Sequence, residues 1–164
     1  MKGSIFTILT LFGAFSASNA AFNIQLVNTG NNTDFDAAFV SAKARWESII
    51  IGDLNNQPSI GVDWFRGQLS ASHMGDVDDV VIGYELKYID GISGVLGSAG
   101  PYYHRTSTNS TVSGGMKFDQ DDFANMSAAN AEIIILHEMG KSPVLWKLLH
   151  TILLFLHSLN IFEL

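Results

Sequence analysis

Apolar residues recur at helical spacing between residues 35 and 50, and this pattern constrains the fold more than any other part of the sequence. The apolar residues are separated by steps of three and four, whereas the charged residues fall between them. Such spacing forms one apolar stripe along a helix, which must pack against a core. The stripe consists of Phe35, Ala38, Phe39, Ala42, Trp46, Ile49 and Ile50. We expect Thr33 or Asp34 to cap this helix and Gly52 to end it.

Strand patterns on both sides of this helix predict a sheet. Residues 22–27 alternate in polarity and predict a first strand, and residues 79–89 predict a longer one. Residues 115–119 are a short strand candidate, whereas residues 91–101 are so rich in glycine that we expect a loop there. A second helix is expected from about Ser127 to Gly140. This order predicts a mixed twisted sheet with two main helices, which we assign to the α+β class.

The first twenty residues have the composition of a secretory signal peptide. Lys2 precedes an apolar stretch from Ile5 to Phe15, and small residues end the segment at Ala20. The apolar stretch is too short to span a bilayer comfortably, which disfavours a membrane anchor. We therefore expect cleavage after Ala20 and a secreted, extracellular protein.

Composition restricts the partners and the chemistry of the chain. Its 164 residues contain no cysteine, so disulfide bonds and thiolate ligands are excluded. The net charge of -7 disfavours nucleic acid and anionic membranes as partners, because phosphate contacts need clustered lysine and arginine. Asn-x-Ser/Thr sequons make Asn31, Asn109 and Asn125 glycosylation candidates, as expected of a secreted glycoprotein.

His137 and Glu138 are adjacent near the end of the expected second helix. Many zinc peptidases have two histidines four residues apart on one helix face, so that both imidazoles reach the same metal ion. The glutamate beside them takes a proton from the metal-bound water. A His-Glu pair alone carries little information, because most such pairs are surface helix residues. The position four residues after His137 is Lys141.

Three sequence blocks resemble the metzincin class of zinc endopeptidases, nearest to the matrixin-like, serralysin-like and leishmanolysin-like catalytic domains. The blocks are residues 96–101 (LGSAGP), residues 115–119 (GMKFD) followed by Asp121 and Asp122, and residues 133–140 (IIILHEMG). The resemblance covers residues 22–140 and implies a secreted zinc metalloendopeptidase. It implies that His137 is the first zinc ligand and Glu138 the general base. It also implies an edge strand that pairs with an extended peptide substrate, at or beside residues 115–118.

After Gly140 the sequence departs from the metzincin pattern His-Glu-x-x-His-x-x-Gly-x-x-His. Lys141 stands at the second ligand position, Val144 at the glycine position and Lys147 at the third ligand position. Neither lysine is a zinc ligand, and the ammonium group of Lys141 repels the cation. We expect residues 21–140 to be a partial catalytic domain without the family's C-terminal subdomain, and the polypeptide as written to be inactive.

Residues 141–164 are rich in leucine, isoleucine and phenylalanine without a clean helical or strand period. One interpretation is a membrane anchor, which Lys147 and the histidines interrupt at a high cost in lipid. A second is a native closing helix in which His150 or His157 replaces a zinc ligand. The third is a translated intron or frameshift, since Gly-Lys-Ser is the reading of GGT AAG T and GTAAGT is a usual intron start. We favour the third, because it explains why all downstream positions fail together.

Two functions follow from these observations. The first is a secreted zinc-dependent metalloendopeptidase, represented by an incomplete catalytic domain. The second is a catalytically dead secreted domain of the same fold that binds peptide without cutting it. Two acidic groups are candidate calcium ligands, although no twelve-residue calcium loop is present and a solvated loop is the simpler interpretation. These groups are Asp76, Asp78 and Asp79, and Asp119, Asp121 and Asp122.

Overall fold

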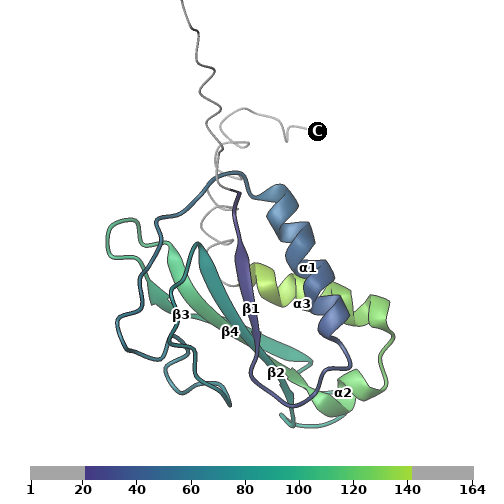
Figure 1. The fold of residues 1–164 in the computed structure, drawn as a ribbon. Coiled ribbons are helices and arrows are strands. Elements are labelled where there is room, and N and C mark those ends of the chain that lie inside the picture. The colour runs from purple at the N-terminus through teal and green to yellow at the C-terminus, as the bar shows by residue number, and fades with distance from the viewer. Residues whose placement is uncertain (1–20, 142–164) are drawn as a thin grey trace, which may run out of the picture.

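A four-stranded mixed sheet forms the centre of residues 21–141, the part of the chain that the computed structural model describes (Figure 1). The elements are β1 (Ile24–Asn28), α1 (Asp36–Ile49), β2 (Val80–Lys87), β3 (Gly97–His104), β4 (Thr111–Asp119), α2 (Gln120–Ala124) and α3 (Ala128–Lys141). The strands lie in the order β1-β2-β4-β3, with β1, β2 and β4 parallel and β3 antiparallel at one edge. The fold is mixed α+β, as predicted.

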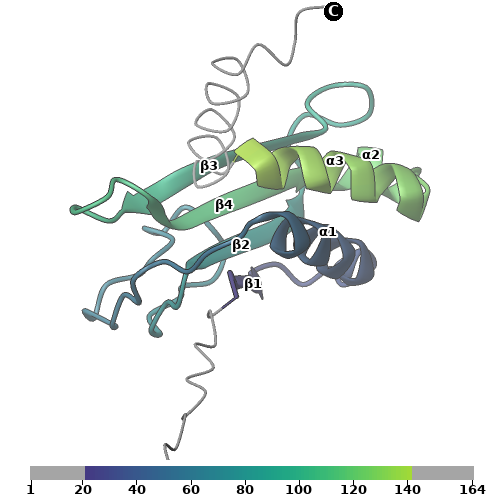
Figure 2. The same cartoon turned by 90° about the horizontal axis from the view of Figure 1, so that it is seen from above.

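β2 is one of the two inner strands, and seven of its eight residues are buried. Its side chains at 80, 82, 84 and 86 face the helices and belong to the main core. α1 and α3 lie next to each other on this side of the sheet (Figure 2). The ring of Phe39 in α1 stacks on that of Tyr84, with 3.8 Å between the ring centroids. Trp46 joins the two helices, because its Nε1–H donates to the carbonyl oxygen of Leu136 at 3.1 Å.

The opposite face of the sheet is covered by the long connection between α1 and β2. Trp64, Phe65 and Leu69 from this connection form a second apolar cluster with Val81 of β2 and Val112 of β4. Such a connection has turns and no regular period, so the hydrophobic pattern did not reveal that it contributes to a second apolar cluster.

The guanidinium of Arg105 binds this connection to the sheet. It is 3% exposed and donates hydrogen bonds to four backbone carbonyl oxygens. The four carbonyl groups belong to Asn55, Asp78, Asp79 and Thr111. The Asp79 carboxylate accepts from the backbone N–H groups of Asn23 and Leu54, both at 2.6 Å. The start of β1, the long connection and the start of β2 are therefore held together by buried polar contacts.

The loop predicted for residues 91–101 is wrong in its second half, which belongs to β3. Gly97 to Pro101 belong to the strand, where they pair with Phe118 to Gly114 of β4. Glycine weakens a strand, but the neighbouring strand provides hydrogen-bond partners, and tertiary pairing overrides the local preference. Gly97 also permits a close approach, since a Cβ there would lie 2.8 Å from the Phe118 ring.

The other predicted elements are present with shifted boundaries, but the predicted cap of α1 is wrong. Phe35 occupies the N-cap position without a side-chain hydrogen bond, because residues 33–36 form a turn in which the Thr33 carbonyl accepts from the Asp36 N–H. Ile49 is 62% exposed instead of core, because α1 ends there and Ile50 is buried in its place. The short helix α2 was not predicted.

Several predictions fall on residues outside the described part of the chain. They are the signal peptide at 1–20 and the tail from 142 onward, including Lys147, His150 and His157. Within residues 21–141, no helix has the length and apolarity needed to cross a membrane.

Replacing Gly83 with alanine tests whether the long connection is packed closely on β2. A Cβ at this position would overlap Leu69 and would lie 2.9 Å from Phe65 Cζ. We expect Gly83→Ala to lower the free energy of unfolding by about 1–3 kcal/mol, measured by urea denaturation. Gly100→Ala is the matched control, because a Cβ on that strand glycine meets nothing within 4 Å. Equal effects of the two substitutions would show that the connection does not pack on β2 as described.

Candidate functional site

α3 carries His137 and Glu138 near its C-terminal end. This end lies beside the amino ends of the parallel strands, because Trp46 contacts Leu136 while neighbouring Glu47 accepts from the Ile24 N–H at 2.7 Å. The helix buries Ala131, Ile135 and Met139, so the side chain of His137 points away from the core and is exposed. The predicted pair is thus on a helix, with the histidine accessible.

Glu138 is 4% exposed, and its carboxylate is bonded to Lys141. Lys141 Nζ donates to Glu138 Oε1 at 2.7 Å, one helical turn farther along α3. The second carboxylate oxygen, Oε2, is buried and has no hydrogen-bond partner among the described residues. The glutamate predicted as general base therefore forms an ion pair with the lysine that stands at the second ligand position.

Residues 21–141 do not form a zinc site around His137. A catalytic zinc needs three protein ligands and an open position for water. His137 supplies one ligand, while Lys141 supplies a cation that already binds Glu138. Within the described chain, no group of three histidine, aspartate or glutamate side chains close enough to share one ion includes His137. The third predicted position, Lys147, lies beyond the described residues.

β3 is one of the two edge strands of the sheet, and β1 is the other. β3 pairs with β4 on one side, and the strand order ends with it. The segment Gly115–Phe118, expected at or beside the edge, lies in the neighbouring strand β4 and pairs with both β2 and β3. β3 also packs against α3. An edge strand with a free backbone side can accept an extended peptide as an additional strand.

Of the first predicted calcium group, only Asp78 and Asp79 lie close together. Asp78 and Asp79 lie with Asp53, and carboxylate oxygens of the three are within 4.8 Å of one another. Asp76 is separate and accepts from the Ser59 N–H at 2.6 Å. Burial raises the pKa of Asp79, hydrogen bonds from the backbone oppose this, and the nearby carboxylates of Asp78 and Asp53 raise it further. Both Asp79 oxygens already accept backbone N–H groups, which leaves less capacity for a cation.

The second acidic group is organised around Asp119, at the carboxyl end of β4. Its Oδ2 accepts the backbone N–H groups of Ile89, Asp90 and Gly91, at 2.7, 3.0 and 3.1 Å. Its Oδ1 accepts from Asp121 at 2.8 Å and caps α2. Burial alone raises the pKa of Asp119, but these N–H donors lower it by more, and the pKa lies well below its ordinary value. The carboxylate thus has a structural role in joining the loop after β2 to the start of α2.

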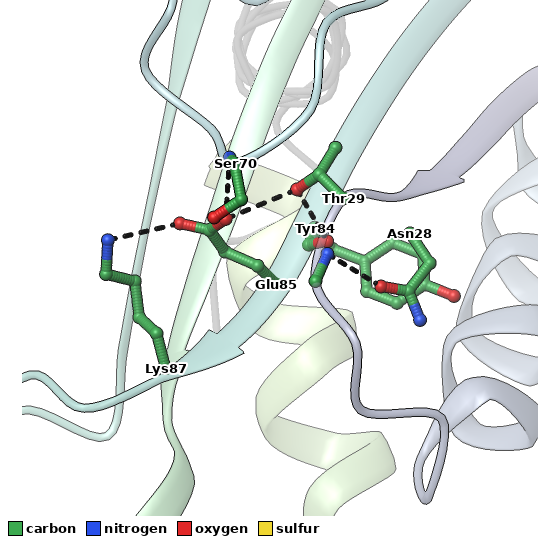
Figure 3. A network of polar contacts seen from close by, with 7 residues as sticks. Asn28, Thr29, Ser70, Tyr84, Glu85 and Lys87 are labelled. Carbon is green, nitrogen blue, oxygen red and sulfur yellow. Dashed lines mark hydrogen bonds and ion pairs between the residues drawn. The ribbon is translucent and has the colours of Figure 1, made fainter.

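A polar cavity that the sequence did not reveal lies at the carboxyl ends of β1 and β2. Its volume is about 820 Å³, and Glu85 of β2 contributes to its lining. Glu85 is 1% exposed, and its Oε2 accepts the Ser70 N–H at 2.9 Å and the Thr29 hydroxyl at 3.4 Å (Figure 3). Lys87 Nζ lies 3.3 Å from Oε1. The available signal was a carboxylate in a strand that is otherwise apolar from Val80 to Leu86.

The three glycosylation candidates are all on the surface. Asn31 and Asn109 are exposed in the connections after β1 and β3. Asn125 is also exposed, although its Nδ2 donates to the Asp121 carbonyl oxygen at 3.0 Å. Their accessibility is compatible with glycosylation, which stays a prediction.

Comparison with known proteins adds no identification: no protein-family model, no curated protein and no solved structure matches the chain. The metzincin resemblance therefore rests on the three sequence blocks alone.

The pH dependence of stability tests the role of Asp119. Its folded pKa lies below the ordinary value of 3.8, so its contribution to stability is present above that pH and is lost as the pH falls toward the folded pKa. Asp119→Asn should lower stability at pH 7, because the amide nitrogen cannot accept N–H donors, and the loss should shrink below about pH 4.

Asp76→Asn provides the matched control for this measurement, because that carboxylate is exposed and accepts one backbone N–H. Urea unfolding of both variants from pH 7 to pH 3 separates the two cases. A loss for Asp119→Asn that stays constant over this pH range would contradict the assignment.

Proposed function

We propose that this chain represents the first part of the catalytic domain of a secreted zinc-dependent metalloendopeptidase of the metzincin type. We propose further that the polypeptide with this sequence does not cleave peptides. The observation that carries the proposal is the position of His137 and Glu138 on the last turns of α3, beside the edge strand β3. In this proposal His137 corresponds to the first zinc ligand and Glu138 to the general base.

The sheet supports a peptide or protein as the partner. Three parallel strands end in an antiparallel edge strand, and β3 leaves one side of its backbone without a partner strand among the described residues. A peptide added to this edge gains main-chain hydrogen bonds independent of its sequence, and pockets for alternate side chains then provide specificity. This mode of binding suits an endopeptidase, whose substrate must lie extended past the reacting groups.

The residues near Glu138 support the proposed absence of activity. A general base must lie beside the water whose proton it takes, whereas the group beside Glu138 Oε1 is the Lys141 ammonium, at 2.7 Å. The same ammonium stands where the second ligand is needed. A single histidine does not hold a catalytic zinc ion, so no hydrolytic step can be assigned to residues 21–141.

The ion pair between Glu138 and Lys141 also favours a second candidate function. It satisfies one oxygen of a buried carboxylate that would otherwise be costly, as expected if the sequence is native and has lost catalysis. The chain would then be a secreted domain that binds peptide at β3 without cutting it. The two candidates share the fold and differ in whether Lys141 belongs to the natural protein.

Zinc affinity after substitution of Lys141 tests whether His137 occupies a ligand position. The full chain should bind no zinc stoichiometrically, measured by competition with a chromophoric chelator. Lys141→His places a second imidazole four residues after His137 and should tighten zinc binding by at least about tenfold. Lys141→Gln is the matched control, because it removes the charge without adding a strong ligand. Equal affinities of the two variants would contradict the ligand assignment, and stoichiometric binding by the unaltered chain would contradict its inactivity.

Sequencing the messenger RNA across the codons for Gly140 to Trp146 separates the two functions. The peptidase proposal expects a spliced form that continues Gly140 with a histidine, and then with the glycine and third histidine of the family pattern. A message that encodes Lys141 and the following residues as printed would exclude the active enzyme and leave the peptide-binding domain.

A further inference from the structure

The cavity that contains Glu85 lies at the opposite end of the sheet from His137. It borders the residues that follow β1 and those that end β2, whereas the C-terminal end of α3 lies beside the start of β1. The peptidase proposal therefore gives this cavity no role. Its lining is mostly polar and includes hydroxyl, amide, carboxylate and ammonium groups.

The Glu85 carboxylate lacks part of the hydrogen bonding that a buried charge requires. An ionised carboxylate has about four acceptor sites, and burial makes each missing donor costly. Oε2 accepts from Ser70 and Thr29, but Oε1 has no hydrogen-bond partner among the described residues, with Lys87 Nζ forming an ion pair at 3.3 Å. Burial raises the pKa of Glu85, the Ser70 and Lys87 contacts lower it by more, and the group is ionised at neutral pH.

The position of the Lys87 ammonium, 3.3 Å from Oε1, favours a neutral ligand at this oxygen. A cationic ligand at Oε1 would be repelled by the Lys87 ammonium beside it, and an anion would be repelled by Glu85 and by Asp34 of the lining. A hydroxyl group satisfies both neighbours, because it donates to the carboxylate and accepts from the ammonium.

The walls of the cavity suit a ligand with several hydroxyl groups. Asn31, Asn32 and Gln120 line it with amides, which both donate and accept hydrogen bonds. Tyr88, 62% exposed, adds an aromatic ring to the lining. The volume of about 820 Å³ lies within the range of small-molecule sites, roughly 300–1,000 Å³.

We propose that this cavity binds a neutral carbohydrate, with one sugar hydroxyl donating to Glu85 Oε1 and accepting from Lys87 Nζ. The sugar has two sources that share this chemistry. It is either a free saccharide or the glycan of the chain itself, because the sequon residue Asn31 lines the cavity. The inference is independent of the peptidase proposal.

Ligand-observed NMR on the full chain tests this inference with glucose, mannose, N-acetylglucosamine and cellobiose, and with putrescine and glycerol phosphate as charged comparisons. We expect saturable binding of at least one neutral sugar and none of the charged compounds. Glu85→Gln and Tyr88→Ala should each weaken the binding by about tenfold, since each removes one strong contact. Ile51→Ala is the control, because Ile51 is exposed and follows α1 at the other end of the sheet.

Thermal unfolding of each variant shows whether it folds. If Glu85→Gln is unfolded, Tyr88→Ala and Gln120→Ala decide the test, because both side chains are exposed. The inference is overturned if no neutral sugar gives saturable binding, if a charged compound binds in preference, or if folded cavity variants bind as tightly as the unaltered chain.

Comparison of glycosylated protein from a eukaryotic secretory host with its Asn31→Gln variant distinguishes the two sources. If the glycan of Asn31 occupies the cavity, free sugar binds only the Asn31→Gln variant. If the ligand is a free saccharide, both forms bind it.

Discussion

The burial of β2 on both faces is the constraint on which the rest of the structure depends. A strand in this position needs an apolar layer on each side, and the two layers come from very different parts of the chain. The helices supply one layer, with Phe39 stacked on Tyr84. An irregular connection supplies the other, with Phe65 above Gly83. Arg105 fixes this connection by binding the backbone near both of its ends and the first residue of β4.

The sequence allowed the regular half of this arrangement to be predicted. The stripe around Phe39 and the alternation around Tyr84 are periodic signals, and both elements are present. The irregular half could not be predicted in the same way. The role of Arg105 depends on carbonyl groups from three separate segments, and β3 depends on pairing with β4, which overrides its glycines. Contacts of this kind join segments that are distant in the sequence, so they produce no periodic pattern within any one segment.

The candidate site shows the same division between local and tertiary information. The sequence pattern correctly predicted a helix that carries His137 and Glu138, but it did not reveal that Glu138 is buried and paired with Lys141. Glu85 was overlooked because it fits the alternation of a strand, and the structure distinguishes it from an ordinary surface residue by its burial and by the cavity beside it. A charged residue in a strand with two apolar faces is therefore a useful signal in sequences of this kind.

The contact between the start of β1 and the start of β2 has a consequence for how the chain folds. The Asn23 N–H and the Asp79 carboxylate are 56 residues apart in sequence. Parallel pairing across such a separation requires a long loop to close before any contact compensates for the lost entropy. Folding is therefore expected to be slow for a chain of this size. Until β4 pairs with β2 and the connection covers it, the backbone edge and the apolar face of β2 are open to association with other chains. Early intermediates are therefore expected to be prone to aggregation.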